Sequence, residues 1–288
     1  MIRMCKTNYE ALNRASSFLA ENNREKEVAR YLLQHVLGKS YSQLMMDLNE
    51  EISTEDFQLF WSYVEEHTTG RPFQYIIGQE TFYDRTFIVD EHVLIPRPET
   101  EELIEEVKKR VKLIFQEDKN LNIADIGTGS GAIAITIKKE IPSASVTATD
   151  ISPKALEMAK QNAHLLEAEI ECKQGDLLAP IANQKWDVLL SNPPYIGQSE
   201  AESLADTVID HEPHLALFAE EDGLQLYRKM AEQLPEMMNI PSLIGFEIGY
   251  LQGPAVKSML QAAFPKATVE VVKDINQKNR FVFCTMDE

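Results

Sequence analysis

The segment Asn122–Lys139 constrains the fold of this chain more than any other part of its sequence. A short apolar run is followed by a glycine loop, Gly127–Gly131 with the sequence GTGSG, and then by a helical run that begins at Ile133. Glycines let the backbone approach a ligand closely. A strand, a glycine-rich turn and a helix in this order predict an open α/β sheet that binds its ligand at the carboxyl end of the strand.

An acidic residue lies where a second strand of such a sheet would end. The run Ser145–Thr149 leads into Asp150, 19 residues after Gly131. A carboxylate at this position accepts hydrogen bonds from ribose hydroxyls. The strand, the glycines and the acid together predict a nucleoside-binding site.

The identity of the nucleoside depends on Asp125. Gly127, Gly129 and Ala132 also satisfy the loose fingerprint of NAD-binding proteins. Asp125, two residues before the first glycine, favours a ligand that carries an ammonium group, such as S-adenosylmethionine, over a pyrophosphate. The alternative for Asp125 is a structural role, because an aspartate at a strand end can cap the next helix.

A second motif, the NPPY tetrapeptide Asn192–Tyr195, follows the apolar run Trp186–Ser191, which is typical of a buried parallel strand. Two prolines remove two backbone donors, so the preceding carbonyls stand free. The side-chain oxygen of Asn192 and the carbonyl of Pro193 can accept both hydrogens of a planar NH2 group, and Tyr195 can stack on it. The motif therefore suits an amide or an exocyclic base amine, although an ordinary strand-ending turn is an alternative.

The chain resembles class I S-adenosylmethionine-dependent methyltransferases, and within them the peptide chain release factor N5-glutamine methyltransferases, the PrmC/HemK family. Besides the two motifs, the resemblance rests on these segments: Val93–Glu101, Asp150–Leu156, Glu212-Pro213, Ala216-Leu217 and Asp222-Gly223. Together they span about two-thirds of the chain. Two departures concern turns only, Tyr83-Asp84-Arg85 where a glycine is usual and Asn276-Gln277 where small residues are usual.

The resemblance implies an α/β fold, namely the Rossmann-like seven-stranded sheet of class I methyltransferases with a small N-terminal helical domain and a β-hairpin linker. The expected domains are a helical substrate-recognition domain at 1–72, the hairpin linker at 73–98 and the methyltransferase domain at 99–288. Apolar spacing and capping patterns predict the following elements: helices at Glu25–Leu37, Ser40–Leu48, Ser53–Gly70, Thr100–Phe115 and Gly253–Ala263, a hairpin within Arg71–Val89, a fifth strand at Leu243–Ile248, and an antiparallel pair at Thr268–Val272 and Phe281–Phe283.

The activity implied is methyl transfer from S-adenosyl-L-methionine to the side-chain amide nitrogen (N5) of the glutamine in the GGQ motif of peptide chain release factors, with S-adenosyl-L-homocysteine as the product. This reaction supports translation termination. The residues expected to act in catalysis and substrate binding are Asn192, Pro193, Pro194 and Tyr195. The residues expected to bind the cofactor are Asp125, Gly127, Thr128, Gly129, Ser130, Gly131, Asp150, Asp176, Leu177 and Asn192. For Asp176-Leu177, a surface turn is an equally good interpretation.

Net charge separates a protein substrate from a nucleic acid. Other amine methyltransferases with a related tetrapeptide act on bases in DNA, and duplex binding relies on Lys and Arg to neutralise phosphates. This chain has 28 Lys and Arg against 46 Asp and Glu, a net charge of −18, with no lysine-rich stretch. We therefore expect no direct nucleic-acid binding, although a local basic patch would reopen that alternative. A third class, a non-catalytic nucleotide-binding adaptor, is disfavoured by the intact tetrapeptide.

The remaining composition predicts a cytoplasmic enzyme without a metal. No apolar run has the length of a membrane span, and no membrane association is expected. The three cysteines, Cys5, Cys172 and Cys284, are far apart and form no metal-binding or disulfide pattern. His211 and His214 are separated by a proline, which breaks the helix that a two-histidine metal site requires.

Overall fold

The structure, a computed structural model, describes residues 5–115, 120–197 and 205–287. The chain divides into two compact units. The helical unit comprises Met1–Gln79 and Ala205–His211, and the sheet unit comprises Glu80–Leu204 and Glu212–Glu288.

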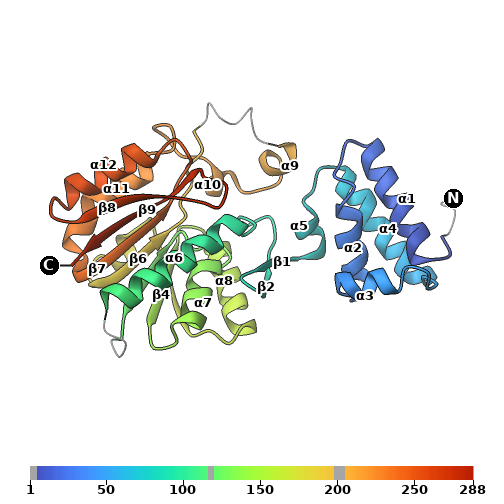
Figure 1. Ribbon diagram of the computed structural model, residues 1–288, viewed down its shortest axis with the longest axis horizontal. Coiled ribbons are helices and arrows are strands. Elements are labelled where there is room, and N and C mark those ends of the chain that lie inside the picture. Colours follow the sequence, from blue (N-terminus) through green and yellow to red (C-terminus); the bar gives the residue numbers. More distant parts are fainter. Residues whose placement is uncertain (1–4, 116–119, 198–204, 288) are drawn as a thin grey trace. The chain divides into compact units, whose positions relative to one another are not determined.

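The helical unit is a small bundle with its own apolar core (Figure 1). Its described helices are α1 (Asn8–Glu21), α2 (Val28–Leu37), α3 (Tyr41–Met46), α4 (Thr54–Thr68), α5 (Phe73–Ile77) and α9 (Asp206–Ile209). Ser40 forms a capping box with Gln43, as its spacing predicted, and Ser53 caps α4. Buried side chains such as Leu32 and Phe60 fill the space between the helices.

The segment after Arg71 differs from the prediction. The sequence predicted a hairpin within Arg71–Val89 and no helix there, whereas the structure places α5 before the hairpin strands β1 (Gln79–Phe82) and β2 (Arg85–Ile88). Pro72 occupies the N-cap of α5, and Gly78 ends it in the left-handed conformation. A five-residue helix is too short to show helical periodicity, which is why its aromatic and aliphatic residues resembled a strand.

The sheet unit contains, among its described residues, a seven-stranded sheet in the order β5-β4-β3-β6-β7-β9-β8, which confirms the predicted Rossmann-like methyltransferase fold. Neighbouring strands are parallel from β5 to β7, and β9 runs antiparallel to both of its neighbours. The strands are β3 (Asn122–Ile126), β4 (Ser145–Asp150), β5 (Ile170–Gln174), β6 (Trp186–Ser191), β7 (Met238–Glu247), β8 (Thr268–Lys273) and β9 (Asn279–Met286). The helices are α6 (Pro98–Ile114), α7 (Ala132–Glu140), α8 (Pro153–Leu165), α10 (His214–Leu217), α11 (Gln225–Gln233) and α12 (Gly253–Ala263), with short 3₁₀ turns at η1 (Ala179–Ile181) and η3 (Leu234–Glu236).

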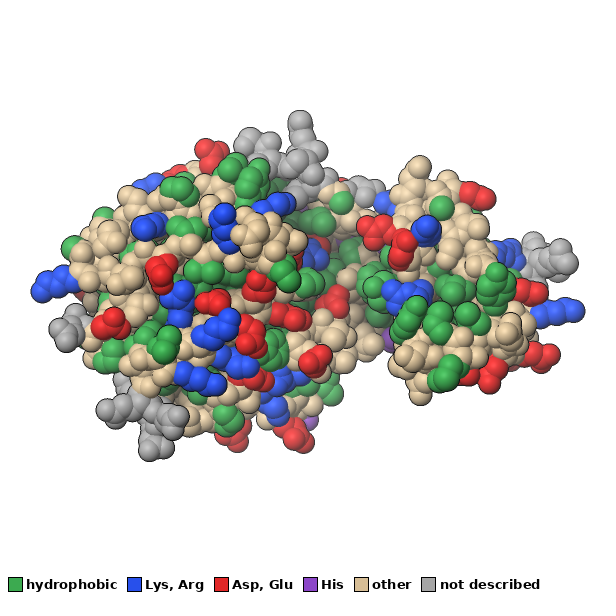
Figure 2. All heavy atoms as spheres, viewed as in Figure 1, with side chains coloured by type: hydrophobic (Ala, Val, Ile, Leu, Met, Phe, Trp, Pro, Cys, Tyr) green, Lys and Arg blue, Asp and Glu red, His purple; other side chains and the backbone are tan. Residues whose placement is uncertain are grey.

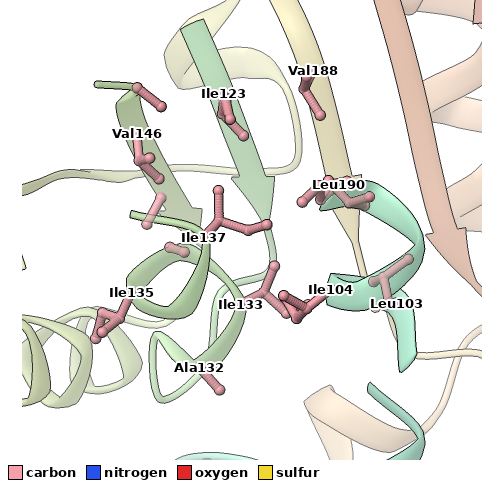
Figure 3. Packing of buried hydrophobic residues seen from close by; sticks show 14 of the residues in the cluster. Leu103, Ile104, Ile123, Ala132, Ile133, Ile135, Ile137, Val146, Val188 and Leu190 are labelled. Carbon is pink, nitrogen blue, oxygen red and sulfur yellow. The ribbon is translucent and has the colours of Figure 1, made fainter. Parts of the chain in front are cut away.

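Apolar layers cover both faces of the sheet. On one face α6, α7 and α8 pack against the strands, and Figure 3 shows Ile104 of α6 and Ile133 and Ile137 of α7 on the helix side of the strands that carry Ile123 and Leu190. On the other face α11 and α12 pack over a second cluster that includes Tyr227 and Phe246. Because both faces of the sheet are covered, all six residues of β6 are buried, including the polar Asp187 and Ser191.

Strand β7 is longer than predicted. It begins at Met238, which pairs with Trp186, instead of at Leu243. Pro241 interrupts the apolar run, and proline counts against a central strand, so the sequence pattern marked only the second half of β7.

Neither a membrane-spanning helix nor a metal centre is found in the part of the chain that the structure describes. Within residues 5–115, 120–197 and 205–287, no helix combines the length and apolarity needed to cross a bilayer. In the same residues, no three His, Cys, Asp or Glu side chains come together in a way that could hold a metal ion.

Candidate functional site

A cavity of about 220 Å³ lies in the sheet unit where β3, β4 and β6 end. Parallel α/β sheets bind ligands at this edge. The cavity brings together these residues that the sequence predicted: Gly127, Thr128, Gly129, Ser130, Asp150, Asp176, Leu177, Asn192, Pro193 and Pro194. Three predicted residues do not line it, namely Asp125, Gly131 and Tyr195.

The glycine loop presents its first two glycines to open space. Gly127 and Gly129 have φ angles of 72° and 54°, and a Cβ atom built on either would meet no atom within 4 Å. Gly131 differs, because a Cβ there would lie 2.8 Å from the Ile135 side chain and 3.2 Å from that of Ala159. The first two glycines therefore leave room for a ligand, whereas Gly131 lets α7 and α8 pack closely.

Asp150 holds the loop and still faces the cavity. Its Oδ2 accepts a hydrogen bond from the Gly129 N–H at 2.9 Å, and its Oδ1 accepts one from the Ser152 N–H, also at 2.9 Å. Burial raises the pKa of the Asp150 carboxyl, and these backbone donors oppose that shift. A carboxylate offers about four lone pairs and three backbone N–H groups face this one, so Asp150 can accept a further hydrogen bond from a ligand in the cavity.

Asp125 lies beneath the loop. It is 1% exposed, and its Oδ2 accepts hydrogen bonds from the Thr128 hydroxyl at 2.6 Å and the Ala134 N–H at 3.2 Å. Among the described residues, its Oδ1 has no hydrogen-bond partner. Burial, helped by the nearby charge of Asp150, raises the pKa of Asp125 to about 7. The observed contacts are those of the helix-capping alternative.

Asn162 joins the glycine loop to the hairpin. Its side-chain amide accepts a hydrogen bond from the Ile88 N–H at 2.7 Å and donates one to the Ile88 carbonyl at 2.9 Å. The same amide nitrogen donates to the Ser130 carbonyl at 2.9 Å. Asn162 is fully buried, and its role could not be predicted from the sequence because it lies within a helix, 74 residues from Ile88.

The NPPY tetrapeptide is positioned by residues that the sequence did not single out. The Asn192 NH2 group lies 3.3 Å from the Thr100 hydroxyl, and that hydroxyl lies 2.7 Å from the Glu247 carboxylate. At the other end of the tetrapeptide, Gln252 donates to the Tyr195 carbonyl at 2.8 Å. One available sequence signal was Glu247 itself, a lone acid at the end of the apolar run of β7.

The Tyr195 ring packs beside the apolar cluster under α11 and α12. Burial, together with the charge of Glu247, raises the pKa of the Tyr195 phenol to about 12, so the hydroxyl is neutral at physiological pH. The sequence predicted that the Tyr195 ring stacks on the substrate amide. In this structure the ring lies beyond the residues that line the cavity.

An ion pair ties two walls of the cavity together. Arg97, in the proline-rich segment before α6, pairs with Glu212, which is 3% exposed. Glu212 also accepts a hydrogen bond from the Ile95 N–H at 3.4 Å. Arg97 and Pro213 both line the cavity, so this pair holds two of the segments on which the family resemblance rested.

Comparisons with known proteins agree with this architecture. The protein-family model described as the PrmC N-terminal domain matches residues 10–78. The family model described as the methyltransferase small domain matches residues 101–217. Among solved structures, a methyltransferase from Pyrococcus furiosus shares the fold, with a TM-score of 0.51 at 14% identity over 72% of this chain and 92% of that one.

Curated relatives that match nearly the full length of this chain have a much higher sequence identity than that structure. A release factor glutamine methyltransferase from Bacillus cereus is 48% identical, with 97% of this chain and 99% of that protein covered. One from Bacillus subtilis is 46% identical, with 96% and 97% covered. Identity at this level over nearly the whole of both chains shows the family, and the chain belongs to the release factor glutamine methyltransferases.

Proposed function

We propose that this protein transfers the methyl group of S-adenosyl-L-methionine to the N5 side-chain amide nitrogen of the glutamine in the GGQ motif of peptide chain release factors. One observation carries the proposal: the Asn192 amide and Pro193 line the same cavity as the glycine loop and Asp150. An acceptor pair for a planar amide thus adjoins a site built for a nucleoside.

The residues of the cavity fit S-adenosylmethionine. Gly127 and Gly129 leave open space beside the backbone, and Asp150 can accept a further hydrogen bond from a ribose hydroxyl. Asp176 and Leu177 line the cavity as the expected contacts of the adenine. Asp125 and Gly131 act indirectly, Asp125 by fixing Thr128 and Gly131 by allowing α7 to start where it does. When bound, the cofactor supplies an electrophilic methyl group on a sulfonium.

The protein acts mainly by orientation. An amide nitrogen is a weak nucleophile because its lone pair is shared with the carbonyl, so alignment and electrostatic stabilisation must supply most of the catalysis. Asn192 and the Pro193 carbonyl accept the two N–H hydrogens and aim the nitrogen at the methyl group. The same two oxygens stabilise the positive charge that grows on the nitrogen. Alignment of this kind contributes on the order of several kcal/mol, and the proton leaves to water afterwards.

The same proposal assigns roles to the rest of the chain. Residues 1–72 recognise the release factor, residues 73–98 form the linker, and residues 99–288 carry out methyl transfer in the cytoplasm. On the face of the sheet unit in Figure 2, basic side chains alternate with acidic ones. Lys108, for example, pairs with Glu140 at 2.7 Å, and Arg110 pairs with Glu270 at 2.7 Å. Paired cations are poorly placed to neutralise phosphates, which favours a protein substrate over a nucleic acid.

The test is to incubate the protein with labelled S-adenosylmethionine and a purified release factor, and to map the label by mass spectrometry. We expect the label on the glutamine of the GGQ motif. A release factor with that glutamine changed to alanine serves as the control and should remain unlabelled. Label on a residue other than a glutamine, or on added DNA or RNA, would overturn the proposal.

A further inference from the structure

We propose that Thr100 and Glu247 are positioning residues that fix the orientation of the Asn192 amide, so that its oxygen and not its NH2 group faces the substrate. This inference rests on the proposed function and names two further residues for the same reaction. Neither residue belongs to the tetrapeptide or to the glycine loop, and they lie on different elements, α6 and β7.

The three side chains form a hydrogen-bonded row. Thr100 is 4% exposed and Glu247 is 1% exposed, so water does not compete for their hydrogen bonds. The Thr100 hydroxyl lies 2.7 Å from Oε2 of Glu247 and 3.3 Å from Nδ2 of Asn192. Asn192, at the end of the row, lines the cavity.

Donor and acceptor counting gives this row a direction. An ionised carboxylate only accepts hydrogen bonds, so the single proton of the Thr100 hydroxyl is donated to Glu247. The Thr100 oxygen can then only accept, and the group of Asn192 that faces it must be the NH2 group. Because the amide is planar, Oδ1 of Asn192 points the other way.

The direction matters because an amide can rotate by 180° at little steric cost, since its oxygen and nitrogen are similar in size. A rotated Asn192 would present a donor to the donor NH2 group of a substrate glutamine. One of the two acceptors that orient the substrate would then be lost. The row formed by Thr100 and Glu247 prevents this rotation before the substrate arrives.

The charge on Glu247 sets the direction, so the row responds to pH. Burial raises the pKa of Glu247 to about 7. Besides its hydrogen bond with Thr100, the carboxyl faces charged and titratable groups from several elements: Arg97 and Glu99 near the start of α6, Tyr195 after β6, Tyr227 of α11 and Arg280 of β9. A protonated Glu247 can donate to Thr100, which frees the Thr100 proton for Oδ1 of Asn192 and favours the rotated amide.

The test compares variants in a release factor methylation assay, with S-adenosylmethionine affinity measured by calorimetry and the melting temperature recorded for each. Thr100→Val keeps the shape but removes the hydroxyl, and we expect kcat to fall about 10- to 100-fold with cofactor affinity nearly unchanged. Thr100→Ser restores the hydroxyl and should recover most of kcat. Glu247→Gln should lower kcat and abolish its dependence on pH between about 6 and 8, where the wild-type kcat falls with acidification.

Two outcomes separate this inference from the proposed function. If the wild-type protein labels no glutamine, the proposed function fails. If it labels glutamine while Thr100→Val keeps the wild-type kcat, the positioning role is wrong and the proposed function stands. Should Thr100→Val fail to fold, the pH profile of Glu247→Gln at saturating cofactor decides, and a profile as steep as that of the wild type would refute the inference.

Discussion

The glycine loop and the NPPY tetrapeptide line one cavity, but contacts of different range hold them. The loop depends on residues nearer in the chain, since Asp125 binds Thr128 across 3 positions, Asp150 binds Gly129 across 21 and Asn162 binds Ser130 across 32. The tetrapeptide depends on distant residues. Asn192 meets Thr100 across 92 positions, and Gln252 meets Tyr195 across 57.

This difference follows the chemistry of each side. A cofactor loop must fit one small molecule, and a strand, a turn and the next strand end suffice to build it. A group that orients a weak nucleophile must be held to a fraction of an ångström, and a single loop with two prolines does not fix its own side-chain amide. Surrounding elements therefore supply the support. If this is correct, variants on the two sides should fail in different ways.

The largest effect is expected for Asn192→Ala, which removes one of the two oxygens that orient the substrate. Methyl transfer should fall about 100- to 1,000-fold, while S-adenosylmethionine affinity changes little. Single-turnover assays with a release factor and calorimetry with the cofactor measure the two quantities separately. An active variant would contradict the orienting role of Asn192, and an inactive one that no longer binds the cofactor would contradict the distinction between the two sides.

The next effect concerns Asp125. Its carboxyl holds the glycine loop, but because the group is buried its ionised form is unfavourable. Its pKa of about 7 in the folded protein lies above the value of 3.8 for an unperturbed aspartate. A raised pKa means that the folded state binds the proton more tightly, so the contribution of this carboxyl to stability is fully present below about pH 4 and is lost as pH rises through 7. Asp125→Asn should remove about 3 kcal/mol of this pH dependence in the free energy of unfolding.

Urea unfolding of the wild type and of Asp125→Asn at pH 4.5, 6 and 7.5 gives the measurement. Glu247 titrates in the same range and contributes a slope of the same sign, so Glu247→Gln provides the matched control. Parallel curves for Asp125→Asn and the wild type would show that Asp125 is ionised in the folded protein near its ordinary pKa.

A smaller effect is expected for Asp150→Ala on the cofactor side. The substitution removes ribose acceptors and the partner of the Gly129 N–H, so S-adenosylmethionine affinity should weaken about 10- to 100-fold. At saturating cofactor, kcat should stay within a few-fold of the wild-type value. Calorimetry measures the first quantity, and unchanged affinity would remove Asp150 from the site.

The smallest effect is expected for Gln252→Ala, on the substrate side. Gln252 donates to the carbonyls of Tyr195 and Asp222 and accepts from the Gly249 N–H, so its loss loosens the tetrapeptide without touching either substrate. We expect kcat to fall about fivefold and the free energy of unfolding to fall by about 1–2 kcal/mol. A change in cofactor affinity in place of kcat would contradict the comparison.

The same contrast explains what the sequence could predict. The strand, the glycine loop and Asp150 could be predicted because their residues are close together in the chain. Helix α12 was predicted with its observed bounds, Gly253–Ala263. The expectation of a seven-stranded sheet came from the family resemblance, whereas the order of its strands came from the structure. In contrast, α5 was missed because five residues carry too little periodicity.

The support of the tetrapeptide could not be predicted from one sequence. Thr100 reads as an ordinary residue in the first turn of a helix, and Gln252 as a polar residue before one. Their roles arise only when α6 and the end of β7 are brought beside β6 by the packing of the sheet. The placement of Tyr195 beside the apolar cluster, away from the lining of the cavity, has the same long-range origin.

The amide of Asn162 gives the molecule a thermodynamic link between its linker and its cofactor loop. This one amide binds both the N–H and the carbonyl of Ile88, at the end of β2, and also donates to the carbonyl of Ser130. Any movement that separates Ile88 from Asn162 frees that amide and so loosens a wall of the cavity. We therefore expect a ligand that stiffens the glycine loop to slow hydrogen exchange at the Ile88 amide, and by reciprocity we expect strain in the hairpin to weaken binding of that ligand.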